Sequence, residues 1–293
     1  MTIIDGKKIA AEIREELKKE IDKLKADGKN VPGLVAIIVG ENPASEVYVK
    51  SKSKACEEIG MRSKIEKLSA KISEENLLEL IRQYNSDKYF NGILVQLPLP
   101  KHISEKKVIE TIHPEKDVDG FHPINVGNLL IGSDTFLPCT PAGIQELLVR
   151  YNIPIQGRHV VVVGRSNIVG KPIANILLQK KENANAVVTV CHSAAKDISY
   201  FTKQADILIA AIGQPNFVKA EMVKDGVAVI DVGINRVQDE THPKGYRIVG
   251  DVDFDEVSKR ASFITPVPGG VGPMTIAMLL KNTHKAYLTQ CFK

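Results

Sequence analysis

The sequence predicts an α/β protein with two domains, and three observations support this prediction. Short apolar runs bounded by Gly, Pro and Asn alternate with stretches of helical periodicity through most of the chain, which is typical of parallel strands joined by crossover helices. A chain of 293 residues is longer than a single hydrophobic core usually accommodates, which favours two domains. Apolar residues make up 43% and charged residues 25%, so the whole chain is expected to fold.

The first half of the chain begins with a stretch of helical periodicity. Ile9, Ile13 and Leu17 recur at the spacing of one helix face, so this face is expected to be buried. Apolar runs and helical patterns then follow in turn. The predicted elements are a helix at 8–25, a strand at 34–39, a helix at 45–59, a strand at 65–68, a helix at 73–84, a strand at 92–97 and a helix at 105–112.

The second half repeats strand signals in the manner of a dinucleotide-binding sheet. A helix at 142–151 precedes predicted strands at 159–163, 187–190, 207–211, 227–232 and 263–264. The last predicted helix, at 274–289, is long enough to pack back onto the first domain. We therefore expect a discontinuous first domain of residues 1–140 and 275–293, and a Rossmann-type second domain of residues 141–274.

Charge and hydropathy argue against several classes of protein. The net charge of +4 comes from 39 basic and 35 acidic side chains without basic runs, so no nucleic-acid partner is expected. The first ten residues, MTIIDGKKIA, lack the basic and apolar segments of a secretion signal. No window of about eighteen apolar residues occurs, so no membrane insertion is expected either.

Cysteines and histidines give no sign of a metal site. The four cysteines stand far apart with no CxxC pair, which predicts neither a zinc site nor a disulfide framework: Cys56, Cys139, Cys191 and Cys291. The histidines His102, His113 and His122 lack the HExxH or similar spacing of a zinc site. Reduced thiols in a cytoplasmic protein fit this pattern best.

A candidate phosphate-binding loop follows the apolar strand at 159–163. It runs from Gly164 to Pro172 and is expected to open the next helix, where backbone N–H groups and the helix dipole favour a phosphate. Its spacing is not G-x-G-x-x-G, so the loop alone is a weak fingerprint. Arg165 either contacts a phosphate or braces the loop.

The end of the next strand indicates which dinucleotide is bound. An NAD enzyme usually presents Asp or Glu there, whereas this chain has Cys191, His192 and Ser193. With Arg165 nearby, a guanidinium and a hydroxyl are available for a 2′-phosphate, which predicts NADP as the cofactor. The alternative role for Ser193 is the N-cap of a helix over 194–200.

Polar residues in the first half form a candidate catalytic set. Tyr48 and Lys52 lie four apart on a predicted helix and share a face, although such a pair is usually a half-buried ring and a solvated charge. Gln96 ends a buried strand, where ligands bind in α/β sheets, or else is tied to the proline turn that follows.

Two further segments have the composition of ligand-binding loops. Asp119 lies in the run from Asp117 to Gly120, which departs from the calcium-loop pattern and reads either as a turn or as a ligand group. The segment 266–275, PVPGGVGPMT, is too rich in glycine for the interior of an element and precedes a helix. It lines a flat ligand or simply connects domains.

Seven segments together resemble the bifunctional methylenetetrahydrofolate dehydrogenase/cyclohydrolase family. They are, in the family's order, residues 48–52, 95–100, 114–120, 138–141, 164–172, 231–235 and 266–275. The link at 180–186 looks a few residues longer than is usual, which affects the alignment of Ser193. The activity of a formate-activating synthetase domain, which is fused in some relatives, is not expected.

The resemblance implies a role for each candidate residue. Lys52 would be the central catalytic group, Tyr48 would stack on the folate, Gln96 would tune Lys52, and Asp119 would hold the pterin ring. The residues implied to contact NADP are Thr140, near the nicotinamide, and Gly164, Arg165, Ser166, Ser193 and Ile234. The residues implied to cover or close the substrate site are Pro268, Gly269, Gly270 and Thr275. A homodimer, formed through the nucleotide domain, is also implied.

The implied chemistry has two steps. NADP+ takes a hydride from 5,10-methylenetetrahydrofolate, and water then adds to the methenyl product to give 10-formyltetrahydrofolate. Lys52 is the candidate proton shuttle for the second step, provided that its amine is desolvated or faces the positive charge of the substrate. The rival readings are an NADP dehydrogenase for another small substrate, a hydrolase with a decayed nucleotide site, and a non-catalytic NADP sensor.

Overall fold

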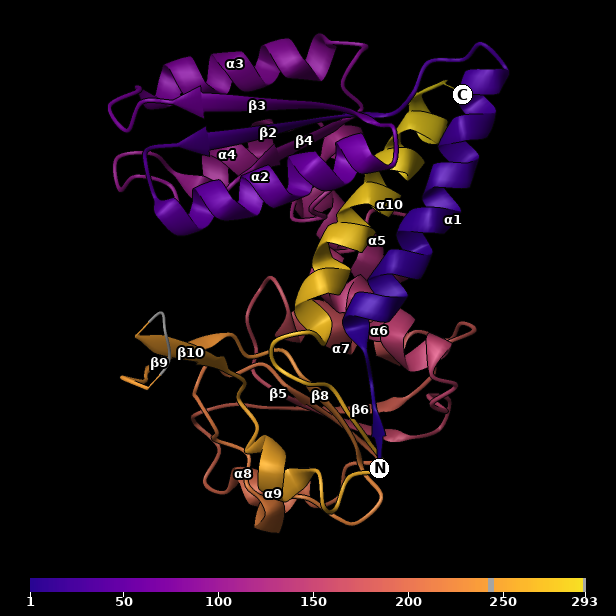
Figure 1. Cartoon of the computed structure of the whole chain (residues 1–293), viewed down its shortest axis with the longest axis vertical. Helices are drawn as coiled ribbons and strands as arrows, with labels where there is room; N and C mark the ends of the chain where they lie inside the picture. Colours follow the sequence, from indigo (N-terminus) through magenta and orange to yellow (C-terminus); the bar gives the residue numbers. More distant parts are fainter. Residues whose placement is uncertain (242–244, 292–293) are drawn as a thin grey trace. The chain divides into compact units, whose positions relative to one another are not determined.

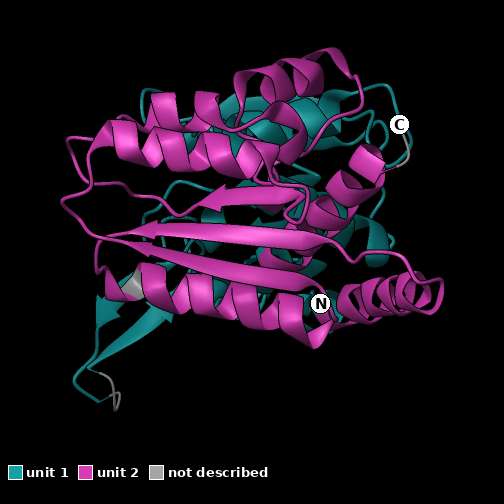
Figure 2. Cartoon of the chain, turned by 90° about the horizontal axis from the view of Figure 1, so that it is seen from above, with its two compact units in different colours: residues 1–10, 140–275 teal, residues 11–139, 276–293 magenta. Residues whose placement is uncertain are grey.

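The protein, described from a computed structural model, divides into two compact units. Residues 1–241 and 245–291 are described, so the last two residues of the predicted range 275–293 lie outside them. One unit contains residues 1–10 and 140–275 and the other contains residues 11–139 and 276–293, shown in two colours in Figure 2. We call them the six-stranded unit and the three-stranded unit after their main sheets.

The three-stranded unit is built on a parallel sheet in the order β3-β2-β4. Its strands are β2 (Gly33–Val39), β3 (Arg62–Leu68) and β4 (Gly92–Val95). Every residue of the central strand β2 is buried, because helices cover both faces of the sheet. Helix α2 (Pro43–Glu58) lies on one face and α3 (Glu74–Ser86) on the other, as Figure 1 shows.

The core of this unit forms between one sheet face and two helices. Alternate residues of β2, such as Val35 and Ile37, pack against Leu77 and Ile81 of α3 and Val108 of α4 (Glu105–Thr111). The period of two along the strand and of about 3.6 along the helix places these side chains on facing surfaces. Hydrophobic burial of this kind is the main stabilising term of the unit.

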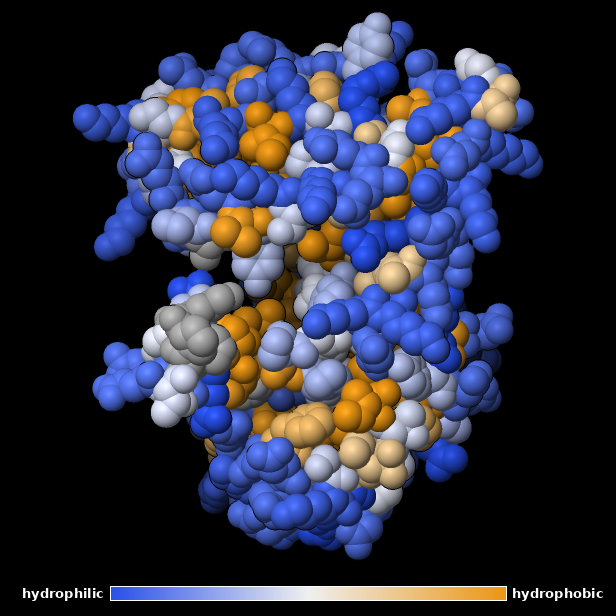
Figure 3. Space-filling view, viewed as in Figure 1, coloured by the Kyte–Doolittle hydropathy of each residue, from blue (hydrophilic) through white to orange (hydrophobic). Residues whose placement is uncertain are grey.

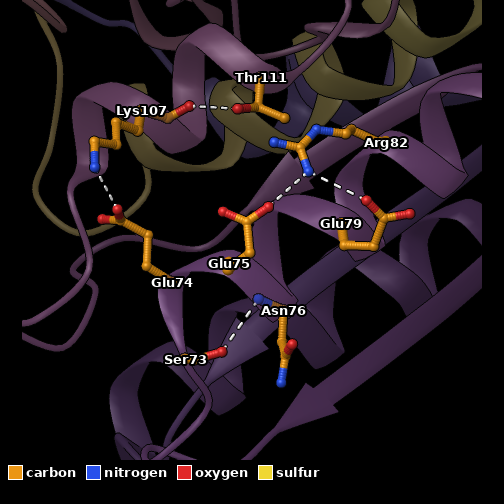
Figure 4. A network of polar contacts seen from close by, with 8 residues as sticks. All are labelled: Ser73, Glu74, Glu75, Asn76, Glu79, Arg82, Lys107 and Thr111. Carbon is orange, nitrogen blue, oxygen red and sulfur yellow. Dashed lines mark hydrogen bonds and ion pairs between the residues drawn. The ribbon is translucent and has the colours of Figure 1, made fainter.

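Helices α3 and α4 begin at serine N-caps and carry a network of surface charges. The Ser73 hydroxyl accepts a hydrogen bond from the Asn76 N–H, which satisfies one free donor of the first turn. Figure 4 shows Arg82 directed at two glutamates of its own helix and Lys107 of α4 directed at Glu74, at 2.6 Å. Exposed ion pairs of this kind contribute little to the free energy of unfolding, so the stability of the unit depends mainly on its apolar core.

The remaining elements of the unit come from the start of the chain, from the segment after α4 and from the end of the chain. They are α1 (Gly6–Ala26), whose first five residues belong to the other unit, the 3-10 helix η1 (Pro114–Lys116), α5 (Pro123–Ile131) and α10 (Val271–Cys291). From Ile276 onward α10 belongs to this unit. The Asn282 side chain on α10 donates hydrogen bonds to the Val118 and Leu137 carbonyls, so the end of the chain packs back onto its first half as predicted.

The six-stranded unit contains one parallel sheet in the order β1-β11-β8-β7-β5-β6. Its strands, in chain order, are β1 (Thr2–Ile3), β5 (His159–Val163), β6 (Val187–Cys191), β7 (Ile207–Ala210), β8 (Ala228–Asp231) and β11 (Phe263–Ile264). Helices α6 (Cys139–Arg150), α7 (Gly170–Leu178), α8 (Ile198–Thr202) and α9 (Phe254–Val257) connect or flank them, with η2 (Ala220–Met222). Parallel strands place their carboxyl ends at one edge, where ligands bind in this fold.

The structure adds elements that the sequence patterns did not predict. Strand β1 pairs with β11, so residues 1–10 lie in the six-stranded unit, whereas the sequence assigned residues 1–140 to the first domain. A hairpin of β9 (Asn235–Gln238) and β10 (Tyr246–Val249) pairs antiparallel beside the main sheet. Helix α5 was also missed.

The surface and the helices of the described part of the chain can be compared with what a membrane span requires. Figure 3 shows hydrophilic side chains over most of the face in view, with apolar side chains scattered among them. Among residues 1–241 and 245–291, no helix has the combination of length and apolar character that is needed to cross a bilayer.

Candidate active site and cofactor site

Lys52 and Gln96 form the centre of a polar cluster in the three-stranded unit. Lys52 lies on α2, one turn after Tyr48, and its Nζ donates a hydrogen bond of 3.1 Å to Gln96 Oε1. Gln96 directly follows β4, and its own Nε2 donates to the Leu97 carbonyl at 2.8 Å. The glutamine is therefore tied to the proline turn, as one of the two readings predicted, and it also accepts a hydrogen bond from the lysine.

The orientation of Gln96 fixes what it can do for the amine. Because Nε2 is used by the Leu97 carbonyl, only the carbonyl oxygen of the amide faces Lys52. An amide oxygen accepts a hydrogen bond without adding a charge, so the amine is held in place and not neutralised by an ion pair. Tyr48 is 48% exposed on the same face of α2, which leaves its ring open to a ligand.

Asp119 carries a buried carboxyl group whose pKa responds to the charge of Lys52. Burial of its carboxyl group raises its pKa to about 6, while the positive charge of Lys52 lowers it and the charge of Asp117 raises it further. A small cavity lined by apolar side chains of β4 and α4 contains Asp117 and Asp119 in its wall.

The turn that presents Asp119 is held on both sides. Asp117 Oδ2 accepts hydrogen bonds from the His122 N–H at 2.7 Å and from Asn125 Nδ2 at 2.8 Å. Asn282 of α10 binds the Val118 carbonyl at 2.8 Å. Gly120 has a φ of 73°, and a Cβ there would lie 2.7 Å from the Phe136 carbonyl oxygen, so only glycine fits.

We predict that Asp119→Asn changes how stability depends on pH. The carboxyl ionises near pH 3.8 when unfolded and near 6 when folded, so below about pH 4 both states are protonated and the penalty of burying the charge is absent. As pH rises from about 4 to 6, wild type loses on the order of 2–3 kcal/mol of unfolding free energy relative to the variant. Urea denaturation of both proteins across this interval measures the difference.

The control for this prediction is Asp22→Asn on α1, where the carboxylate is 56% exposed. Its stability difference from wild type should stay nearly constant across the same interval. A constant difference for Asp119→Asn as well would show that the Asp119 carboxyl is not desolvated in the folded protein.

The loop after β5 has the geometry of a dinucleotide loop. Gly164 has a φ of 128°, and a Cβ there would lie 2.2 Å from the Ala211 carbonyl oxygen, while a Cβ on Gly170 would lie 2.3 Å from the Gly164 carbonyl oxygen. Both glycines are thus required for close backbone packing. The Ser166 hydroxyl accepts hydrogen bonds from the Val169 and Gly170 N–H groups, so part of its role is to shape the loop before α7.

Arg165 and Ser193 lie at the carboxyl ends of paired strands. Val163 of β5 is in register with Cys191 of β6, and the Gly164 N–H donates to the Cys191 carbonyl at 2.8 Å. Both Arg165 and Ser193 are exposed. Within the residues described, the Arg165 guanidinium makes no hydrogen bond or ion pair that would brace the loop.

Ser193 does not cap a helix, contrary to one of the two readings. Helix α8 begins at Ile198, and its N-cap is Asp197, whose carboxylate accepts from the Ser199 N–H at 2.8 Å. Residues 194–197 are therefore not helical, because Asp197 is the stronger cap nearby. The Ser193 hydroxyl thus faces no competing role as a cap.

Other predicted contacts also lie in the six-stranded unit. Ile234 follows β8 and is 56% exposed. Thr140 and Thr275, to which the resemblance gave different ligand roles, share a hydrogen bond of 2.9 Å between their hydroxyls. The start of α6 and the start of α10 are joined at this point.

The glycine-rich loop is held by the N-terminal segment of the chain. Lys7 N–H donates to the Gly269 carbonyl at 3.1 Å, and a Cβ on Gly6 would lie 1.8 Å from the Gly270 carbonyl oxygen. Gly269 and Gly270 are buried, while Pro268 is exposed. The loop is therefore anchored at its glycines, and sequence patterns gave no sign that Gly6 supports it.

The six-stranded unit has a parallel sheet, a loop shaped by glycines after β5 and no carboxylate at the end of β6. The three-stranded unit contributes a cluster centred on Lys52. Together these features are those of a two-domain α/β dehydrogenase. Known families agree with this class. The NAD(P)-binding domain of tetrahydrofolate dehydrogenase/cyclohydrolase matches residues 138–291, and the catalytic domain of the same family matches residues 4–119. The chain belongs to the tetrahydrofolate dehydrogenase/cyclohydrolase family, and NAD(P) is its cofactor.

Relatives and solved structures resemble the chain over almost its full length. The bifunctional protein FolD of Chlorobium chlorochromatii is 58% identical over 289 residues, 98% of each chain, and that of Bacillus pumilus is 58% identical over 97% of each chain. The crystal structure of FolD from Campylobacter jejuni matches with a TM-score of 0.93 at 53% identity over 99% of both chains. A Trypanosoma brucei enzyme, solved with NADP and an inhibitor, matches with 0.93 at 42% identity over 99% and 98% of the two chains.

The structure groups the predicted residues by unit. Tyr48, Lys52, Gln96 and Asp119 come from the three-stranded unit, and all the others come from the six-stranded unit. Among the residues described, no three His, Cys, Asp or Glu side chains gather as a metal site would require. Sequence analysis named Asp117 only as part of the turn, and it missed Asn282, because the partners of Asn282 are backbone carbonyls of distant segments that no local pattern reveals.

Proposed function

We infer that the chain catalyses two successive reactions of one-carbon folate metabolism, the NADP-dependent oxidation of 5,10-methylenetetrahydrofolate and the hydrolysis of the methenyl product to 10-formyltetrahydrofolate. The family and its bifunctional relatives support this function. The observation that carries the second reaction is the amine of Lys52, which is held by a neutral amide oxygen and lies near a desolvated carboxyl group.

In the oxidation the chain would hold NADP+, which when bound would supply the acceptor for a hydride from the bridging methylene carbon. The task of the chain is to bind and align, with Arg165 and Ser193 holding the 2′-phosphate and Gly164 and Ser166 shaping the loop beneath the pyrophosphate. Thr140 would lie toward the nicotinamide, and Ile234 would also contact NADP. No proton has to move on the protein in this step.

In the hydrolysis water adds to the cationic methenyl carbon and the bond from that carbon to N5 breaks. The water loses two protons in all, one of which ends on N5 while the other is released to solvent. Lys52 takes a proton from the attacking water and returns one to N5, which needs a neutral amine. The positive charge of the substrate favours that neutral form, and Gln96 keeps the amine in position.

The roles proposed for the other residues are those that the family resemblance implies. Asp119 would bind the pterin ring through its carboxyl group, and the exposed ring of Tyr48 would stack on it. Pro268, Gly269, Gly270 and Thr275 would cover the substrate. The anchoring of Gly269 and Gly270 by the N-terminal segment favours a fixed wall over a loop that must order on binding.

Deuterium at the bridging methylene tests the oxidation directly. Substrate labelled there should give deuterated NADPH and a slower single-turnover rate than unlabelled substrate. Methenyltetrahydrofolate supplied without dinucleotide should still be hydrolysed. An NADP dehydrogenase for another small substrate would fail the first test, and a non-catalytic sensor would fail both.

We also propose that the protein is a cytoplasmic homodimer formed through strand β6. This strand is the last of its sheet, with one side unpaired within the unit, and it exposes Val187 and Val190 by 62% and 40%. Leu178, at the end of α7, is exposed as well. An apolar edge strand of this kind is a template for pairing with a second copy.

Val190→Lys should convert the dimer to a monomer, because a charge on the edge strand opposes pairing. Light scattering coupled to gel filtration measures the mass. The matched control is Val126→Lys on α5, where the valine is also 40% exposed and the mass should stay that of a dimer. A Val190→Lys protein that remains dimeric would place the interface elsewhere.

A further inference from the structure

Two buried carboxylates form a linked pair at the carboxyl edge of the six-stranded sheet. Asp231, the last residue of β8, accepts hydrogen bonds from the Asp251 N–H at 2.9 Å and the Val252 N–H at 3.0 Å. It therefore holds the segment that contains Asp251. Asp251 is fully buried, with no exposed surface.

The Asp251 carboxylate reaches back to the loop after β7. Its Oδ2 accepts hydrogen bonds from the Ile212 N–H at 2.8 Å and the Gly213 N–H at 2.9 Å. These residues directly follow Ala211, whose carbonyl oxygen would lie 2.2 Å from a Cβ on Gly164. The carboxylate thus fixes the backbone against which the dinucleotide loop packs.

The same carboxylate also reaches the loop after β8. Its Oδ1 accepts a hydrogen bond of 2.9 Å from Asn235 Nδ2, and a Cβ on Gly233 would lie 2.3 Å from this oxygen. Ile234 lies between these two residues and comes within 3.9 Å of a Cβ built on Gly272. Both oxygens of one side chain therefore hold two neighbouring loops.

We propose that Asp251 is a positioning residue for NADP, which sets the loops after β7 and β8 in register with the loop at Gly164. This inference rests on the proposed placement of NADP at this edge of the sheet. The Asp251 carboxylate is buried and accepts its hydrogen bonds from protein donors, so it acts through the two loops. Three donors converge on its two oxygens, so no neutral side chain of similar size can serve them all as strongly.

The test is the Michaelis constant for NADP+ in two variants of Asp251. Asp251→Ala leaves three donors without their acceptor, and we expect KM for NADP+ to rise about tenfold or more, since small displacements of a binding loop weaken ligand alignment. Asp251→Asn retains one accepting oxygen and should give a smaller rise. Hydrolysis of methenyltetrahydrofolate without dinucleotide, and KM for the folate substrate, should stay within about twofold of wild type.

The matched control is Asp206→Asn, at the opposite edge of the same sheet. The Asp206 carboxylate also accepts a backbone hydrogen bond, from the His159 N–H at 2.8 Å, and pairs with Lys224. It is placed before β7, away from the proposed NADP edge, so KM for NADP+ should not change.

Two outcomes would overturn the inference. A folded Asp251→Ala protein with the wild-type KM for NADP+ would show that the loops keep their register without the carboxylate. Equal losses in oxidation and hydrolysis would make Asp251 a general structural residue. If Arg165→Ala also left NADP+ binding unchanged, the proposed NADP site itself would fail, whereas an effect of Arg165→Ala alone would reject only the role of Asp251.

Discussion

Lys52→Met should lose hydrolysis of methenyltetrahydrofolate by about a hundredfold to ten-thousandfold, the range that a general acid or base contributes. Methionine approximates the length of the lysine stem but has no proton to exchange, and Gln96 Oε1 loses its donor. Binding of NADP+ should be unchanged, because Lys52 lies in the three-stranded unit. Stopped-flow decay of the methenyl absorbance measures the hydrolysis.

The control for this prediction is Lys54→Met, two residues further along α2. The Lys54 side chain is 77% exposed and its amine pairs with Glu58 at 3.8 Å. The substitution therefore removes the same amine from the same helix, at a position that faces solvent. Its hydrolysis should match wild type. Full hydrolysis by the Lys52→Met protein would contradict the assignment of Lys52 as the proton shuttle.

Arg165→Ala should remove most of the preference for NADP+ over NAD+. A charged hydrogen bond to phosphate is worth about 1.5–3 kcal/mol, so kcat/KM with NADP+ should fall roughly tenfold to hundredfold. The value with NAD+, which has no 2′-phosphate, should change little. Parallel initial-rate measurements with the two dinucleotides give the ratio.

Arg158→Ala is the matched control, because Arg158 is exposed and immediately precedes the same strand, β5, at its other end. Its preference for NADP+ should remain that of wild type. If Arg165→Ala reduced activity with both dinucleotides equally, the guanidinium would act on the pyrophosphate or the loop and not on the 2′-phosphate.

Long elements with clear periodicity were predicted from the sequence. The strand HVVVV begins and ends as expected at His159 and Val163, and α1 has the predicted buried row that includes Ile13. These elements could be predicted because their residue pattern and their burial are both local properties of the chain. Strand β1 could not, because a strand of two residues has no periodicity and forms only when β11 is beside it.

The candidate site also contains residues that local patterns predicted and residues that they did not. Lys52 and Gln96 lie 44 residues apart, yet each was singled out by its place on a helix face or at a strand end, and the structure joins them by a hydrogen bond. Asp251 and Asn282 gave no signal, because each acts by binding backbone groups of distant segments. An aspartate or asparagine with such a role has the same local sequence as one in any turn.

Turnover of the purified protein with 5,10-methylenetetrahydrofolate tests the central claim most directly. With NADP+ the absorbance of the methenyl product should rise and then decay faster than in buffer without the protein, and with NAD+ the rise should be much slower. This result would establish both activities in one chain. A folded protein that turns over the substrate with neither dinucleotide, or that forms the methenyl product without accelerating its decay, would contradict the account.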